Sequence, residues 1–375
     1  MALPRIIILK GLIFSLIIIF LSSCETKNED EVIIPPSNSG YTDGTLILNQ
    51  GTFPTETGTV DFMEKNGSVH HGIFHAANNG EEAGNVVQSA FTMNNYTFLV
   101  VNNADKIIVV DKFDFTKIKE ITELPSPRYF LGAGSTKAYV SCWDNTIKII
   151  DIDNLQVTGS IPTGTGPERM KFINNKLWVL NQGGLSIDST ITIINPVADT
   201  VLATLEVYPK PSGIVVDYNM NVWIMCSGHG WNNNPGNSDS KGHLLCVDPF
   251  DYSIITDIEF PDNSKHPEQL IVNNVGDKLF YNYPGGISLI SVDDPVVFDS
   301  PFIPHNNMFN GLLFSKSENF IYASDALDYQ QNGIVYRFNG ITGELIDSGS
   351  AGLIPGEFYF VDFPASARPG RVNPF

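Results

Sequence analysis

The chain is poor in basic residues. It has 22 lysines and arginines against 41 aspartates and glutamates, which gives a formal net charge of −19 and a pI near 4.6. A polyanion would be repelled over most of such a surface, and no basic stripe offsets that repulsion. A nucleic-acid partner is therefore not expected. Charged residues make up only 17% of the sequence and hydrophobic residues 42%, which favours a well-filled fold.

Signatures of catalysis are also missing. The sequence has no Gly-x-Ser-x-Gly elbow, no Cys-x-x-Cys pair and no complete phosphate-binding loop. The Asn/Asp/Ser-rich run 232–239 lacks the spacing of a calcium loop, although bound calcium there stays an open alternative. No metal-ligand spacing such as His-Glu-x-x-His is found among His70, His71, His75, His229 and His266. The sequence thus predicts no enzyme, no catalytic residues, no metal and no cofactor.

Long hydrophobic runs are absent except at the N-terminus. Arg5 and Lys10 precede the run Gly11–Leu21, which is too short to span a bilayer and is typical of a secretory signal. The run ends in Leu-Ser-Ser-Cys24, which resembles the lipobox of bacterial lipoproteins. We therefore predict a lipoprotein signal peptide at residues 1–23 and lipidation of Cys24, the alternative being an ordinary signal peptide. Residues 24–44 are acidic and contain Pro, Ser and Gly, which predicts a flexible tether.

The rest of the chain, residues 45–375, is built from repeats. Apolar β-rich runs punctuated by 32 Gly and 23 Pro recur with a period of roughly 45 residues, which is in the range of a propeller blade. We predict an all-β fold, a seven-bladed β-propeller, in which the stretch Gly356–Phe363 adds a strand beside the first unit and closes the ring. Trp178 and Trp223 fall at one equivalent point of the second strand and are expected to pack between blades. The first unit spans Thr45–Glu64, and the others begin near Phe91, Pro127, Pro167, Pro211, Pro267 and Phe309.

An acid or amide closes the third strand of most units. A short carboxylate or amide at the start of a turn can accept a hydrogen bond from the backbone two residues on, so we expect a structural role. A metal site is the alternative, but these positions are distributed around the ring. They are Asp111, Asp151, Asn195, Asp248 and Asn339.

Cysteine is scarce, with four in the chain. A two-residue turn at Asp144-Asn145 would place Cys142 opposite Ile147, and the same register would place Cys226 opposite Leu244 and Cys246 opposite Ile224. Cys226 and Cys246 would then be diagonal neighbours, and Cys142 lies two blades away from Cys226. We therefore expect three buried free thiols.

Loops between the second and third strands differ most between units. In a propeller these loops share one face with the blade-to-blade connections, and variable loops on a rigid scaffold carry function. Trp143 and Trp231 lie in such loops, where a large ring left open marks a binding surface. Arg128 and Arg169 have an alternative role as structural ion-pair partners. The candidate ligand-binding residues are Arg128, Tyr129, Trp143, Asp144, Glu168, Arg169, His229, Trp231, Gln269, Tyr283, Phe309 and Tyr329, with His266 and Met308 at the same mouth.

The repeat units resemble those of YncE-like, YVTN-type seven-bladed propellers. The likeness lies in "IIVVDKFDF", "IKIIDIDNL" and "ITIINPVADT", while "LILNQGTF", "GNVVQSAF", "LPSPRYFL" and "KLWVLNQGG" resemble the surface lipoprotein propellers of Bacteroidota. The acidic cluster at residues 29–31 resembles the export signal of such lipoproteins, a generic solvated linker being the alternative. One branch, the BtuG lipoproteins, captures cobalamin (vitamin B12) and passes it to a TonB-dependent outer-membrane transporter. The resemblance implies a lipid-anchored, surface-exposed outer-membrane protein that binds cobalamin or another corrinoid on its loop face.

Two other functional classes remain open. A surface scaffold or adhesin that binds glycan or protein would use the same face of the same fold. A propeller lactonase or quinone-dependent oxidoreductase is disfavoured because no nucleophile and base can be paired. Neighbouring genes would discriminate between the classes. A neighbouring corrinoid transporter would favour the corrinoid-binding protein, and a neighbouring polysaccharide locus would favour the adhesin.

Overall fold

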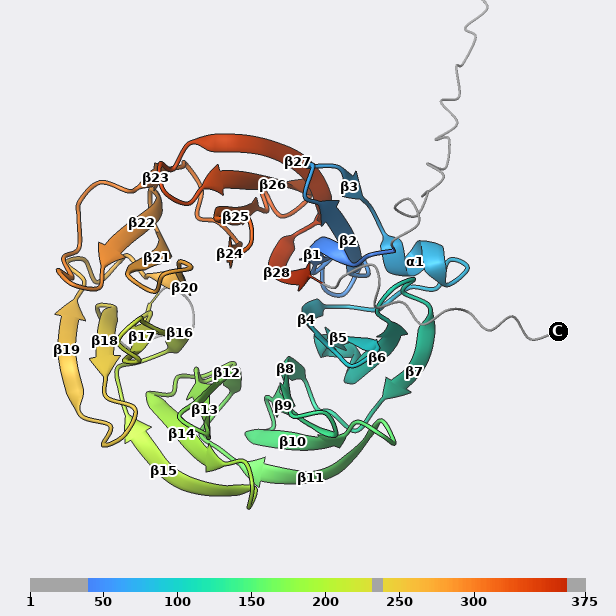
Figure 1. The fold of residues 1–375 in the computed structure, drawn as a ribbon, viewed down its shortest axis with the longest axis horizontal. Coiled ribbons are helices and arrows are strands. Elements are labelled where there is room, and N and C mark those ends of the chain that lie inside the picture. The colour runs from blue at the N-terminus through green and yellow to red at the C-terminus, as the bar shows by residue number, and fades with distance from the viewer. Residues whose placement is uncertain (1–39, 231–238, 363–375) are drawn as a thin grey trace, which may run out of the picture. The chain divides into compact units, whose positions relative to one another are not determined.

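A computed structural model describes residues 40–230 and 239–362. These residues form seven four-stranded antiparallel sheets arranged around a centre, as Figure 1 shows. The seven-bladed β-propeller predicted from the repeats is therefore confirmed. Within the described ranges, no helix is long and apolar enough to span a membrane. The predicted signal peptide and Cys24 lie outside the described residues.

The blades are numbered along the chain, and the strands of each blade are named from the centre outwards. Blade 1 contains β28 (Pro355–Asp362), β1 (Asp43–Asn49), β2 (Thr59–Glu64) and β3 (Val69–His70). Blade 2 contains β4 (Val87–Met93), β5 (Tyr96–Val101), β6 (Lys106–Asp111) and β7 (Lys117–Ile121). Blade 3 contains β8 (Pro127–Ala133), β9 (Lys137–Cys142), β10 (Thr146–Asp151) and β11 (Gln156–Pro162). Blade 4 contains β12 (Pro167–Ile173), β13 (Lys176–Asn181), β14 (Thr190–Asn195) and β15 (Thr200–Glu206).

The remaining blades follow the same plan. Blade 5 contains β16 (Pro211–Val216), β17 (Val222–Cys226), β18 (His243–Val247) and β19 (Ile254–Glu259). Blade 6 contains β20 (Glu268–Val272), β21 (Lys278–Tyr283), β22 (Gly286–Ser291) and β23 (Ile303–Pro304). Blade 7 contains β24 (Gly311–Ser315), β25 (Phe320–Asp325), β26 (Asn332–Asn339) and β27 (Leu345–Leu353). A short helix α1 (Ile73–Ala77) connects blades 1 and 2, and a 3-10 turn, η1 (Asn102–Ala104), follows β5.

The ring is closed by strands from both ends of the described chain. β28 pairs antiparallel with β1, from Asp43 opposite Asp362 to Asn49 opposite Pro355. This is the closure predicted from the GEFYFVDF stretch. The buried carboxylate of Asp61 on β2 reinforces it, because it accepts hydrogen bonds from the backbone N–H of Gly352 on β27 and of Gly72, and from Asn49 Nδ2. Opening the ring would take the Gly352 donor of blade 7 away from this buried carboxylate.

Burial falls from the second strand outwards. The second strands are buried on both faces because each lies between two neighbouring blades, and their runs are accordingly β-branched or aromatic. The outermost strands alternate between exposed and partly buried residues. Trp178 and Trp223 are at most 2% exposed and lie in the apolar clusters that join adjacent blades, as predicted. Phe98 of blade 2 stacks on Phe130 of blade 3, with ring centroids 4.3 Å apart.

The acid or amide that closes the third strand has the predicted structural role. At all five positions the side-chain oxygen accepts a hydrogen bond from the backbone N–H two residues on, at 2.7 to 2.9 Å. Asp111, for example, accepts from Phe113 at 2.8 Å. These residues set the turn into the outer strand.

The predicted hairpin register of blade 3 is wrong by one residue. Thr146 lies opposite Cys142, and Ile147 opposite Ser141, so the loop has three residues, Trp143 to Asn145. The same correction applies in blade 5, where Cys246 lies opposite Trp223 and Cys226 opposite His243.

The outcome predicted for the cysteines is confirmed for Cys142, Cys226 and Cys246, which are buried free thiols. Burial raises the pKa of the Cys226 and Cys246 thiols to about 12. Because the thiolate is the reactive form, these groups are structural.

The two faces of the propeller differ in what they carry. Inner strands begin on one face, which we call the pocket face, and the turns between third and fourth strands lie on the opposite face, which we call the turn face. Tyr41 is buried, and its backbone N–H donates to the carbonyl of Phe113 in such a turn at 2.9 Å. β28, an inner strand, ends at Asp362 on the turn face. The described chain thus begins and ends on the turn face.

Candidate functional site

Irregular pairing recurs where the inner strands begin. In six blades the inner strand has one extra residue relative to its neighbour near its start, which is a β-bulge. A bulge re-aims side chains that a regular strand would direct into the blade. Gln269 adopts a left-handed backbone at its bulge, with φ of 58°. The re-aimed residues are Gln88, Arg128, Tyr129, Glu168, Arg169, Ser212, Gln269, Leu270 and Gly356.

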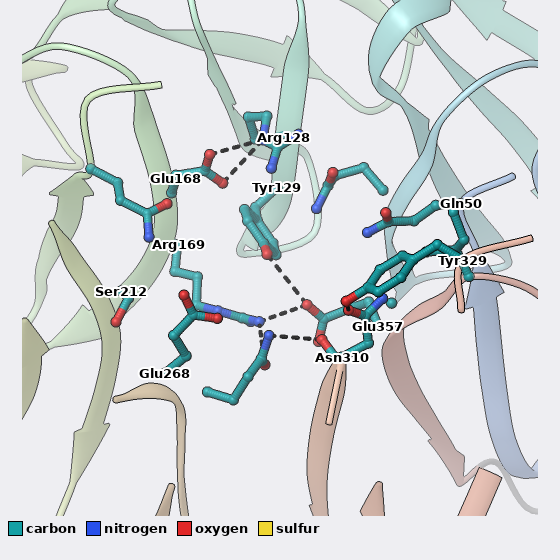
Figure 2. Close-up of a pocket in the computed structure, with 15 residues that line it drawn as sticks. Gln50, Arg128, Tyr129, Glu168, Arg169, Ser212, Glu268, Asn310, Tyr329 and Glu357 are labelled. Carbon is teal, nitrogen blue, oxygen red and sulfur yellow. Dashed lines mark hydrogen bonds and ion pairs between the residues drawn. The ribbon is translucent and has the colours of Figure 1, made fainter. Parts of the chain in front are cut away.

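These bulges surround a central pocket. Figure 2 shows polar side chains from several blades converging on this pocket. Its volume is about 280 Å³. Every bulged residue except Leu270 contributes to its wall. The lining residues are Gln50, Gln88, Arg128, Tyr129, Glu168, Arg169, Gln182, Ser212, Glu268, Gln269, Asn310, Tyr329, Ile354, Gly356 and Glu357.

The first charge cluster of the pocket consists of Arg128, Glu168 and Trp143. Arg128 Nε donates to both carboxylate oxygens of Glu168, at 2.9 and 3.1 Å. Trp143 Nε1 donates to Glu168 Oε1 at 2.8 Å, and the Arg128 guanidinium lies over the Trp143 ring, 4.3 Å from its centroid. Glu168 is only 5% exposed, so it depends on these donors for its charge. Trp143 is therefore fixed beside the pocket.

The second charge cluster joins blades 3, 4, 6 and 1. Arg169 Nη2 donates to Glu357 Oε2 at 2.7 Å and to Gln269 Oε1 at 3.3 Å. Tyr129 donates its hydroxyl proton to Glu357 Oε2 at 3.3 Å, and the Arg169 guanidinium lies 4.8 Å from the Tyr129 ring centroid. Burial is the largest single influence on Arg169 and opposes its charge, but Glu357, Tyr129 and Glu168 together outweigh burial and raise the pKa of the guanidinium. Burial raises the pKa of Tyr129, which stays protonated.

Four polar groups of the pocket have no partner within the described part of the chain. The side-chain amides of Gln50, Gln88 and Gln182 make no hydrogen bond there, and the Glu268 carboxylate makes neither a hydrogen bond nor an ion pair. Gln88 is only 6% exposed. Burial raises the pKa of Glu268, and the positive charge of Lys210 partly offsets this. Buried polar groups are normally paired, so the open amide of Gln88 makes this pocket the candidate ligand site.

Six of the twelve candidate ligand-binding residues line this pocket, namely Arg128, Tyr129, Glu168, Arg169, Gln269 and Tyr329. Trp143 lies directly behind them. Asp144 is exposed, and its carboxylate accepts hydrogen bonds from Thr146 Oγ1 and Lys148 Nζ, both at 2.6 Å.

The remaining candidates lie away from the pocket wall. His229 is buried, with its backbone paired to Ser240. Tyr283 packs against Phe260, and Phe309 is buried among aromatic rings of blade 7. His266 is buried and bonds the carbonyl of Ser227, and Met308 is half-buried. Trp231 lies outside the described residues.

The sequence did contain a signal for two of the pocket residues that were missed. The tripeptide Asn-Gln-Gly occurs at the same point of blades 1 and 4, as residues 49–51 and 181–183. Asn49 Nδ2 donates to Thr59 and Asp61, and Asn181 Nδ2 donates to Thr190 and Thr192, so each Asn is structural and the following Gln faces the pocket. The other missed residues are Gln88, Ser212, Glu268, Asn310, Ile354, Gly356 and Glu357.

The chemistry of the site is that of hydrogen bonding. Within residues 40–230 and 239–362, no three His, Cys, Asp or Glu side chains are grouped so that they could hold a metal ion. The two arginines are neutralised by carboxylates, and the open groups are amides and one acid. The site can therefore bind a polar organic group.

The comparisons with known proteins identify a family. A family model described as a domain of unknown function, DUF5074, matches residues 43–293, which is well over half of the chain. The chain belongs to the DUF5074 family. Among curated proteins, none matches the sequence.

Several solved structures resemble the DUF5074 chain. A quinonprotein alcohol dehydrogenase-like protein of Bacteroides thetaiotaomicron has a TM-score of 0.65 and 12% identity, covering 86% of this chain and 79% of that one. Hydrazine synthase of Kuenenia stuttgartiensis has a TM-score of 0.57 and 11% identity, and the match covers 72% of this chain and 89% of that one. The computationally designed Ika8 protein has a TM-score of 0.56 and 13% identity, covering 86% and 92%. At these identities the likeness shows the fold.

Proposed function

We propose that this DUF5074 protein is a lipid-anchored outer-membrane protein that captures cobalamin or a related corrinoid in its central pocket and passes it to a TonB-dependent transporter. The observation that carries the proposal is the pocket itself. Bulged inner strands present neutralised charges and open amides at one preformed site. Ordering such a site on binding costs little, because closed blades already fix the backbone.

A large ligand could place one of its groups in the pocket and rest on the surrounding pocket face. The cavity of about 280 Å³ is smaller than a corrinoid, so it takes one part of the macrocycle while the remainder lies across the pocket face. Tyr329 lies near its edge, and Trp143 lies behind its wall. The described chain begins on the turn face, so a flexible tether attached there leaves the pocket face unobstructed.

Titration calorimetry of residues 25–375 with cyanocobalamin tests this function. We expect saturable binding without added metal. Gln88→Leu should weaken it by about 1–2 kcal/mol, roughly five- to thirtyfold, since a buried amide loses its ligand hydrogen bonds. Gln156→Leu, at an exposed position of β11, is the matched control and should bind as the unaltered protein does. No heat from cyanocobalamin at micromolar protein would refute the corrinoid proposal.

The membrane anchor has its own test. Cys24→Ala should release the protein from the membrane fraction of cells, because the substitution removes the site of lipidation. A variant that stays with the membranes would contradict lipidation at Cys24.

One observation favours glycan binding as the second candidate function. The ring of Tyr329 is 52% exposed at the edge of the pocket, with its hydroxyl held 3.2 Å from Asn310 Oδ1. A fixed, open ring beside amides suits the apolar face of a sugar. Binding on a glycan array, abolished by Tyr329→Ala, together with no heat from cyanocobalamin, would support this candidate.

A further inference from the structure

Every charged side chain of the pocket wall except one has an ion-pair partner among the described residues. Glu168 is bound by Arg128, and Glu357 by Arg169. Glu268, from β20, is the third pocket carboxylate and has no ion-pair partner among the described residues. Three carboxylates against two guanidinium groups leave one carboxylate of the pocket wall, that of Glu268, without an ion-pair partner.

Donors and acceptors are both available elsewhere in the same pocket wall. The amides of Gln50, Gln88 and Gln182 each offer N–H donors and a carbonyl acceptor, and all three are unused within the described residues. Arg128 binds Glu168 through Nε, and Arg169 binds Glu357 and Gln269 through Nη2, which leaves other N–H groups of both guanidiniums.

We infer that the pocket recognises a primary carboxamide and that Glu268 makes it discriminate against the corresponding carboxylate. An amide NH₂ donates to Glu268 while its carbonyl accepts from the glutamine or guanidinium N–H groups. A carboxylate ligand brings a second negative charge to Glu268 without a donor. An ammonium ligand supplies donors to Glu268 but no acceptor for the N–H groups of the glutamine amides.

The inference rests on the proposed function, because primary carboxamides surround the corrin ring and give a corrinoid several groups of this kind. It adds which chemical group of the ligand enters the cavity. It also names Glu268 as the residue that determines specificity.

The test compares cyanocobalamin with its isolated monocarboxylic acids, each with one peripheral amide hydrolysed. At least one acid isomer should bind the unaltered protein at least tenfold more weakly than cyanocobalamin does. In Glu268→Gln the same isomer should bind within threefold of cyanocobalamin, because the repelling charge is gone. Glu206→Gln, at an exposed position of β15, is the matched control and should keep the full discrimination.

The inference is overturned if every acid isomer binds as cyanocobalamin does, or if Glu268→Gln keeps the discrimination. If cyanocobalamin itself does not bind, the proposed corrinoid function is refuted. The inference about Glu268 is then tested by comparing the binding of propionamide with the binding of propionate. Saturation-transfer NMR should then show that propionamide contacts the unaltered protein and that propionate does not. Both probes should contact the Glu268→Gln variant. Absence of propionamide contact, or equal contact of both probes with the unaltered protein, would overturn the carboxamide assignment.

Discussion

Pairing of individual side chains distinguishes the scaffold of the pocket from its binding groups. A buried ion pair adds little net stability over an apolar pair, but removing one partner leaves an uncompensated charge and costs about 3–5 kcal/mol. Arg128 with Glu168, and Arg169 with Glu357, therefore fix the geometry of the wall. The unpaired Glu268 is different, because its burial is a cost that a ligand can relieve.

That cost gives a prediction for the stability of the unliganded protein. The pKa of Glu268 is raised by burial, so the folded state binds this proton more tightly than the unfolded state does. The free energy of unfolding of the unaltered protein, relative to that of Glu268→Gln, therefore falls as the pH rises from the ordinary pKa of glutamate through the raised pKa. Above the raised pKa the difference is constant. Scanning calorimetry at a series of pH values should find Glu268→Gln more stable than the unaltered protein at pH 7–8, with the difference vanishing towards acid pH. A difference that does not change with pH would contradict an ionised, uncompensated Glu268.

The sequence predicted charged pocket residues better than neutral ones. Arg128, Glu168 and Arg169 stand in connections that the repeat pattern placed at one mouth, whereas Glu268 and Glu357 were missed. Gln88 gave no comparable signal, because a lone glutamine at the start of a strand resembles any surface residue. Its role depends on a bulge, and a bulge depends on pairing between strands, which a single sequence does not display.

At the scale of strands, regular pairing builds the blades and irregular pairing builds the site. The repeat anchors placed the starts of the blades well, since Pro127, Pro167 and Pro211 begin β8, β12 and β16. The register was off by one in blade 3 because the loop at Trp143 has three residues. Side-chain alternation determines which residues of a strand point to each face, but the length of the loop determines the pairing register. The dipeptide Asp144-Asn145 suggested a two-residue loop, which is one residue too short.

Closure of the ring gives the prediction at this scale. Phe358 of β28 is 4% exposed and packs with Ile47, Tyr322 and other residues of blades 1 and 7. Phe358→Ala should lower the free energy of unfolding by about 3–5 kcal/mol, because it leaves a cavity at the closure. Phe298→Ala, at a residue 57% exposed, is the control and should change it by less than about 0.5 kcal/mol. Denaturant unfolding measures both, and equal effects would contradict a closure that depends on β28.

The propeller as a whole places the ends of the described chain and the central pocket on opposite faces. The described chain begins and ends on the turn face, and the bulged strand starts form the pocket on the opposite face. The net charge of −19 disfavours anionic ligands over the entire surface, and Glu268 does the same within the pocket. Repeats in the sequence predicted this architecture because each blade must bury its faces against neighbours. The ligand is not encoded in the repeats, since they describe blades rather than contacts.

The central claim is that the pocket at the start of the inner strands is where a corrinoid binds. A structure of the protein with cyanocobalamin tests it most directly. We predict the macrocycle over the pocket face, with one carboxamide between Glu268 and the amides of Gln88 and Gln182. A corrinoid bound on the turn face or the outer strands, or a complex in which the pocket stays without ligand contacts, would contradict the account.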